Sequence, residues 1–301
     1  MFGGHYQAGE GLFEYVNETW VFDIDKVCWQ LIKCTGELPT PRYGHSTQVV
    51  GSRMFIFGGK GKGGVLQDVM FLDLVEWIWV PVSALQQGPS ARMNHASSLV
   101  GRKIVIHGGW DGEETFTDLW IFNTDSFGWM QPRTSGFAPS GRFGHSMNLT
   151  EDGRLLCFGG CSISKDSGSP KYNDDMRELD TASMVWSRPR VHGDAPTGRY
   201  GHTAMLMGPE NNHLVLVGGW GAGGCQTNES INNPKAFSMH VFNVATMTWS
   251  IPHKHGKKPL KHLYNFGACG NDSGDYMYIY GGYDGRQASF DNFFINVLLD
   301  V

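Results

Sequence analysis

The chain has 301 residues, a formal net charge of −5 at pH 7 and 18% charged residues. This acidic balance, with no basic stripe, disfavours nucleic acid as a partner. Hydrophobic residues make up 41% and aromatic residues 13%, which excludes a disordered chain. No apolar stretch approaches the roughly 20 residues that cross a bilayer, and no secretory signal pattern opens the chain. We therefore expect a non-membrane protein of the cytoplasm, or of the nucleus.

Six Gly-Gly pairs divide the chain, and each one ends a short apolar run. They lie at residues 3-4, 58-59, 108-109, 159-160, 218-219 and 281-282. Successive pairs are 55, 50, 51, 59 and 63 residues apart. A self-similar period of this size indicates an array of small supersecondary units.

Within one repeat, four short runs of alternating apolar residues follow each other. The best-marked copies begin with GELPTPRYGHS, GFAPSGRFGHS or GDAPTGRYGHT, at Gly36, Gly136 and Gly193. The second run ends at the glycine pair, and the fourth holds one tryptophan: Trp29, Trp79, Trp129, Trp186 or Trp249. Period-2 runs separated by Gly, Pro, Asn and Asp predict a four-stranded antiparallel sheet.

This pattern resembles the kelch repeat, and the resemblance covers nearly the whole chain. It implies an all-β, six-bladed β-propeller that occupies residues 1–301 as a single domain. Because the first glycine pair stands at residues 3-4, we expect blade 1 to lack its first strand. The last repeat stops without a tryptophan, so we expect blade 6 to lack its fourth strand.

The loops at one end of the blades are longer than the repeat requires. In antiparallel blades the β2–β3 and β4–β1 loops emerge at the same end. Segments 5–17, 161–173 and 220–237 are predicted to be long loops there. Binding residues concentrate on such loops, so this end is the predicted binding face.

An Arg-x-x-His segment precedes the first strand of four repeats. Its arginines are Arg42, Arg92, Arg142 and Arg199, and counting from Pro259 puts His262 at the same place in a fifth copy. One interpretation is a ring of guanidinium groups that binds carboxylate. The alternative is structural: each arginine pairs with an acid such as Asp68, Asp118, Asp175 or Asp291, and each histidine bonds a backbone carbonyl. Because the residues are identical from repeat to repeat, the structural alternative has the stronger support.

Residues directly after the glycine pairs differ between repeats. His5, Trp110, Trp220 and Tyr283 are candidates for partner binding, because exposed aromatic residues are enriched at binding hot spots. The alternative is that these rings only cover the end of a blade.

Motifs for catalysis are missing. Some propellers that resemble this one are copper radical oxidases or iron-dependent specifier proteins, but their metal motifs are not found here. Neither a G-x-S-x-G elbow nor an HExxH pair occurs. We therefore predict no enzyme activity, no cofactor and no metal.

These observations predict a protein-interaction scaffold or adaptor. Its loop-rich face would bind a peptide of a partner protein, in one form an acidic motif or a C-terminal carboxylate. The alternative is a propeller that targets or regulates a catalytic domain, for example a phosphatase, in a larger protein.

Overall fold

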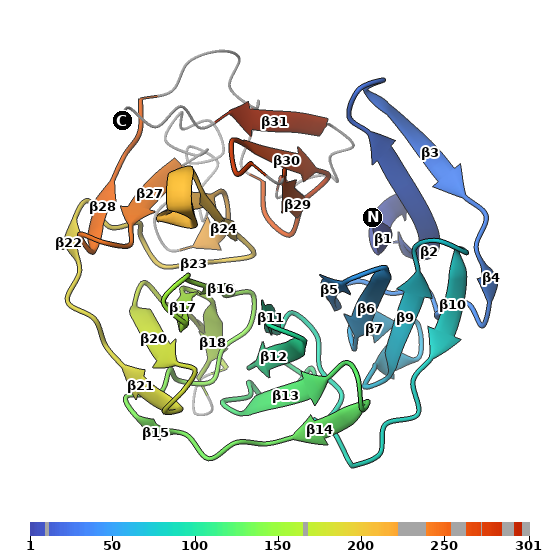
Figure 1. The fold of residues 1–301 in the computed structure, drawn as a ribbon, viewed down its shortest axis with the longest axis horizontal. Helices are drawn as coiled ribbons and strands as arrows, with labels where there is room; N and C mark the ends of the chain where they lie inside the picture. The colour runs from blue at the N-terminus through green and yellow to red at the C-terminus, as the bar shows by residue number, and fades with distance from the viewer. Residues whose placement is uncertain are drawn as a thin grey trace. The chain divides into compact units, whose positions relative to one another are not determined.

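The computed structural model describes residues 1–9, 12–164, 168–221, 239–253, 263–271, 273–284 and 292–296. These residues form short β-strands joined by turns, with one 3-10 helix, η1 (Pro209–Asn211) (Figure 1). The chain divides into two compact units, Met1–Pro132 and Arg133–Val301.

The first unit contains three antiparallel sheets and one small hairpin. Across the sheets the strands run β1 (Phe2–Gly9), β2 (Leu12–Asp23), β3 (Cys28–Ile32); β10 (Ile78–Pro81), β9 (Val69–Asp73), β6 (Arg53–Phe57), β5 (Ser46–Val50); and β11 (Ala96–Val100), β12 (Lys103–His107), β13 (Leu119–Asn123), β14 (Gly128–Met130). The two-residue strand β4 (Thr35–Gly36) pairs in parallel with the outer edge of β10. The hairpin consists of β7 (Lys60–Gly61) and β8 (Gly64–Val65).

The second unit repeats this design. Its sheets run β21 (Val185–Ser187), β20 (Met176–Asp180), β17 (Arg154–Phe158), β16 (Ser146–Leu149); β28 (Thr248–Ser250), β27 (Met239–Asn243), β25 (His213–Val217), β24 (Thr203–Met207); and β29 (Gly267–Gly270), β30 (Tyr276–Tyr280), β31 (Asn292–Asn296). Strands β15 (Ser135–Gly136) and β22 (His192–Gly193) are the parallel additions at the outer edges. Two small ladders join β18 (Cys161–Ile163) to β19 (Pro170–Tyr172) and β23 (Arg199–Tyr200) to β26 (Trp220–Gly221).

One kind of turn joins the third and fourth strands of the blades. An Asp or Asn at the end of the third strand accepts hydrogen bonds from backbone N–H groups two and three residues on, as Asp73 does from Val75 and Glu76. The residue four positions on has a positive φ, 57° at Trp77 and 55° at Phe127. A short side chain that bonds the local backbone favours such a turn, so the sequence itself directs each hairpin.

The core forms between successive sheets, because both faces of the central strands are buried. In β6, Phe55 and Phe57 pack with Ile104 and Phe122 of the next sheet. The alternate residues of β6 pack towards the preceding sheet, in a cluster that includes Phe2 and Trp79. One sheet cannot bury both of its faces alone, so each blade depends on its neighbours.

Two sequence-based expectations need correction. The sequence predicts six blades, with blade 1 lacking its first strand and blade 6 lacking its fourth. The all-β blades are present, but the count of six is too high: within the described ranges four sheets have the four strands of a complete blade, and the sheets nearest the two ends of the chain have three strands each. Segment 5–17, expected to be a loop, is mostly hairpin, because β1 continues past its glycine pair and pairs with β2 as far as Gly9 and Leu12. The glycine pair bends this strand without ending it, as the register shift between Phe2 and Gly4 shows.

Candidate functional site

The four arginines of the repeated segment are buried and bonded within the fold. In each copy Nε donates to the carbonyl two residues earlier, and Nη1 donates to the carbonyl of the first glycine of the pair: Arg42 to Gly58, Arg92 to Gly108, Arg142 to Gly159 and Arg199 to Gly218, at 2.8–3.1 Å. Three copies also form an ion pair with an Asp before the third strand, Arg42 with Asp68, Arg92 with Asp118 and Arg142 with Asp175, at 2.6–2.8 Å. We call each set of arginine and glycine carbonyl, with the Asp in the copies that form the ion pair, an arginine staple.

The staples also connect neighbouring blades. The N–H of the second glycine of one blade donates to the carbonyl of the arginine that begins the next, from Gly59 to Arg92 at 2.9 Å and from Gly160 to Arg199 at 2.7 Å. The arginine side chain then bonds the glycine pair of its own blade. Arg42, which accepts the same bond from Gly4 N–H at 2.8 Å, Arg92 and Arg199 are therefore each a link between two successive glycine pairs.

This geometry favours the structural interpretation of the arginines over partner binding. The side chains of Arg42, Arg92 and Arg142 are 1%, 0% and 1% exposed, and their guanidinium groups are occupied. Asp175 responds to this pairing: burial opposes its ionisation, but Arg142 and Arg177 lower its pKa to about 2. Arg199 is 6% exposed, and burial lowers its pKa to about 10.

The histidines of the segment are also part of the packing between blades. His95 Nε2 lies 2.7 Å from Ser46 Oγ, and His202 Nε2 lies 3.0 Å from Ser146 Oγ. Burial, aided by the neighbouring arginine, lowers the pKa to about 3 in both. In His45 burial and Arg42 lower the pKa to about 4, and this ring bonds the backbone of Phe2. The predicted backbone bond therefore holds for His45, whereas His95 and His202 use serine hydroxyls.

The residue after each arginine pairs with the residue after each glycine pair. The antiparallel pairs are Tyr43 with Lys60, Met93 with Trp110, Phe143 with Cys161, Tyr200 with Trp220 and Tyr264 with Tyr283. The backbone thus sets two variable side chains next to each other at the same place in every repeat. The sequence singled out Trp110, Trp220 and Tyr283 among these residues, and it gave no signal for the residues paired with them.

In the second unit these pairs bring six rings into one continuous set, which we call the aromatic strip: Phe143, Tyr172, Tyr200, Trp220, Tyr264 and Tyr283. Tyr200 lies 5.9 Å from Tyr172 and 5.7 Å from Tyr264 between ring centroids. Tyr264 in turn contacts Trp220 at 5.1 Å and Tyr283 at 5.6 Å. Phe143 is buried beneath Tyr200, and the other five rings are partly exposed. The sequence-predicted residues Trp220 and Tyr283 both belong to this strip.

Comparison with known proteins places these repeats. The model of the KLHDC2/KLHL20/DRC7 Kelch-repeats domain matches residues 1–219. The chain belongs to the kelch-repeat family. It is 26% identical to Acyl-CoA-binding domain-containing protein 4 of Arabidopsis thaliana, over 88% of this chain and 30% of that protein. It is 28% identical to Host cell factor of Drosophila melanogaster, over 43% of this chain and 8% of that protein. It is also 28% identical to Rab9 effector protein with kelch motifs of Rattus norvegicus, over 44% of this chain and 31% of that protein. The kelch chain therefore spans less than a third of the length of these relatives.

The other predicted residues of the kelch chain lie apart from the strip. His5 is in the β1–β2 hairpin of the first unit, where its ring contacts Tyr43 at 4.4 Å and Phe13 at 5.5 Å. Burial lowers the pKa of His5. Trp110 is partly buried and pairs with Met93 and Thr115.

In the fifth copy of the kelch segment, the predicted His262 lies outside the described residues. Leu263 occupies the place of the arginine there, because its carbonyl accepts the bond from Gly219 N–H at 2.9 Å. Asn265 and Phe266 follow at the places of Gly44 and His45, so counting from the proline misaligned this copy by one residue. Segment 220–237 lies outside the described residues beyond Gly221.

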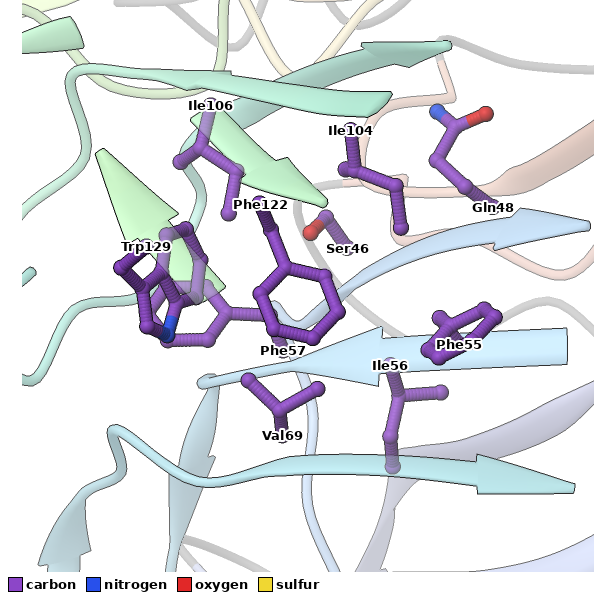
Figure 2. Close-up of a pocket in the computed structure, with 10 residues that line it drawn as sticks. All are labelled: Ser46, Gln48, Phe55, Ile56, Phe57, Val69, Ile104, Ile106, Phe122 and Trp129. Atoms are coloured by element: carbon purple, nitrogen blue, oxygen red, sulfur yellow. The ribbon is translucent and has the colours of Figure 1, made fainter. Parts of the chain in front are cut away.

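The crevice between the second and third kelch sheets is a packing gap. It is lined by apolar residues of both sheets together with Ser46 and Gln48, and Figure 2 shows Phe57, Phe122 and Trp129 pointing towards one another there. Its volume of about 10 Å³ would hold one water molecule at most. No ligand function follows from it.

Proposed function

We propose that this kelch domain is a protein-interaction module and that the aromatic strip forms part of its binding face. Five adjacent, partly exposed rings on a rigid backbone are the observation that carries the proposal. Tyr and Trp supply a large contact area with few rotatable bonds, which is why they dominate binding hot spots. Trp110 and His5, at the equivalent place in other repeats, are proposed as further contact residues.

An acidic motif or C-terminal carboxylate as the ligand has less support. Such a ligand needs a guanidinium group within reach, whereas three of the four arginines are engaged by aspartates. The double variant Arg142→Ala with Arg199→Ala separates the alternatives. We expect its melting temperature to fall, because both side chains are buried and bond the glycine pair of their own blade. Partner loss at an unchanged melting temperature would instead support the carboxylate ligand.

Affinity capture followed by mass spectrometry tests the proposed binding face. Trp220→Ala with Tyr283→Ala should lose the partners that the unmodified domain captures and should keep its circular dichroism spectrum. Phe137→Ala is the matched control, because Phe137 is a 70% exposed aromatic residue of the same unit outside the strip. Equal capture by all three proteins would contradict the proposal.

A second candidate function is a targeting or regulatory propeller within a larger protein, for example one with a phosphatase domain. The relatives favour it, since the chain matches 30% of the Arabidopsis thaliana protein and 31% of the rat protein. Sequencing the transcript beyond both ends tests it, and stop codons directly outside the open frame would contradict it.

We propose that residues 1–301 act as one domain without catalytic activity, in the cytoplasm or nucleus. Among the described residues, no helix is long and apolar enough to cross a bilayer.

A further inference from the structure

We infer that the aromatic strip binds a proline-rich segment in the polyproline II conformation. This inference rests on the proposed function and names the chemistry of the partner. It starts from the spacing of the four tyrosines Tyr172, Tyr200, Tyr264 and Tyr283, whose successive ring centroids are 5.9, 5.7 and 5.6 Å apart.

The spacing matches a polyproline II chain. Such a chain rises about 3.1 Å per residue, so two residues cover roughly 6 Å. Successive rings of the strip can therefore contact every second residue of an extended peptide. The rings are also turned relative to one another, by 16°, 57° and 88°, which makes the surface ridged rather than flat. Ridged rows of aromatic rings accommodate pyrrolidine rings between them, as in other proline-recognition grooves.

The chemistry of the ring edges fits the same ligand. A polyproline II chain has no internal hydrogen bonds, so its carbonyl groups need donors from the surface that binds it. Tyrosine hydroxyls and the indole N–H of Trp220 are donors. Burial raises the pKa of Tyr200, with further contributions from Tyr264 and Tyr172, and its hydroxyl is hydrogen-bonded to the side chain of Tyr264.

Charge around the strip favours an uncharged ligand. Among the described residues within two positions of a strip residue, the exposed charged side chains are Lys171 and Asp174, which have opposite signs, and Asp284 beside Tyr283 is 5% exposed. Arg142 and Arg199 are buried and bonded to glycine carbonyls. Single-stranded nucleic acid also stacks on aromatic rows, but it requires a positively charged groove beside them.

The pairing of the backbone keeps the rings in place before a ligand arrives. Tyr200 and Trp220 belong to the β23–β26 ladder, Tyr264 is paired with Tyr283, and Tyr172 ends β19. A preformed surface and a preformed polyproline II helix both lose little conformational entropy on binding.

Fluorescence anisotropy with a labelled decaproline peptide tests the inference. We expect saturable binding to the unmodified domain and at least about tenfold weaker binding to Trp220→Ala and to Tyr283→Ala. Phe137→Ala should bind like the unmodified domain. Thermal melts of all four proteins show whether a loss of binding comes from unfolding, and Trp220→Phe, which keeps the ring without the N–H, should restore most of the affinity.

Three labelled competitors of the same length define the outcomes that overturn the inference: an oligoglutamate, an oligolysine and an oligothymidine. Tighter binding of any of these than of decaproline would show a different ligand class. If decaproline binds Trp220→Ala and Tyr283→Ala as tightly as it binds the unmodified domain, the binding site lies outside the strip. If decaproline fails to bind while the same variants still lose their captured partners, the inference falls and the proposed function stands; if capture is also unaffected, both fall.

Discussion

The arginine staples and the aromatic strip contain residues that are consecutive in the sequence, yet their roles differ. The staples bond parts of the fold to each other, and the strip is the proposed binding surface. Arg199 is 6% exposed and bonds Gly218, whereas Tyr200, the next residue, is partly exposed and contacts the rings of Phe143, Tyr172 and Tyr264. In a strand, neighbouring side chains point to opposite faces. The arginine is the same in four repeats, whereas the residue after it varies as Tyr43, Met93, Phe143 and Tyr200, of which Met93 and Phe143 are buried.

Removing a staple should have the largest effect on stability. Arg92→Ala leaves Asp118 partly buried without its ion pair and also removes a cation–π contact with Phe116 at 4.2 Å. We expect the free energy of unfolding to fall by about 3 kcal/mol, measured by urea denaturation. Arg102→Ala is the control, because the Arg102–Asp125 pair is exposed and its loss should cost less than about 1 kcal/mol. Equal losses would show that the staples are not structural.

The glycine pair comes next. Gly58 has φ +62°, and a Cβ there would lie 2.6 Å from the Arg92 carbonyl oxygen. Gly51 has φ +60° but nothing within 4 Å of an added Cβ. In both alanine variants the positive φ should lower the free energy of unfolding by about 1 kcal/mol. In Gly58→Ala the additional clash should bring the total loss to about 2 kcal/mol. Indistinguishable melting curves for the two variants would contradict the contact between blades.

The buried histidines should make the blades sensitive to acid. The pKa of His95 is about 3 in the folded chain and 6.5 as the ordinary value, so the unfolded chain binds more protons between these pH values. Stability therefore falls as pH drops from about 6.5 towards 3, by up to roughly 1.4 kcal/mol per pH unit for each such histidine. His95→Gln should reduce this slope, since glutamine can bond Ser46 without titrating. The exposed His192→Gln is the control, and identical slopes in urea denaturation from pH 7 to 4.5 would contradict the assignment.

A strip residue should matter least for stability. Trp220 is partly exposed and contacts one ring of the strip, so Trp220→Ala should lower the free energy of unfolding by about 1 kcal/mol or less. The same urea denaturation used for Arg92→Ala measures it. A loss as large as that of Arg92→Ala would remove the distinction between the staples and the strip.

The repeats were predictable because their signals are local. A glycine pair with positive φ at both residues, a turn with Asp or Asn, and a tryptophan in the fourth strand each act within a few residues. The sequence did not predict the β1–β2 hairpin. In the other repeats the second strand ends at the glycine pair, and no local residue pattern shows that β1 continues past its own pair to Gly9.

The site was harder to predict because its parts are distant in sequence. Arg142 and Asp175 are 33 residues apart, whereas the other two Arg–Asp pairs are 26 residues apart, because an inserted hairpin lies between Arg142 and Asp175. Tyr172 and Tyr200 meet across two blades, and no pattern of spacing links them.

The sequence by itself determined the repeat, its strands and its membership of the kelch family, because backbone conformation and alternating burial depend on local residue types. Only the tertiary structure decided that the repeated arginines are bonded inside the fold and that aromatic residues of the second unit form the aromatic strip. That decision depends on which side chains meet across blades, and contacts between blades are set by packing rather than by position in the chain.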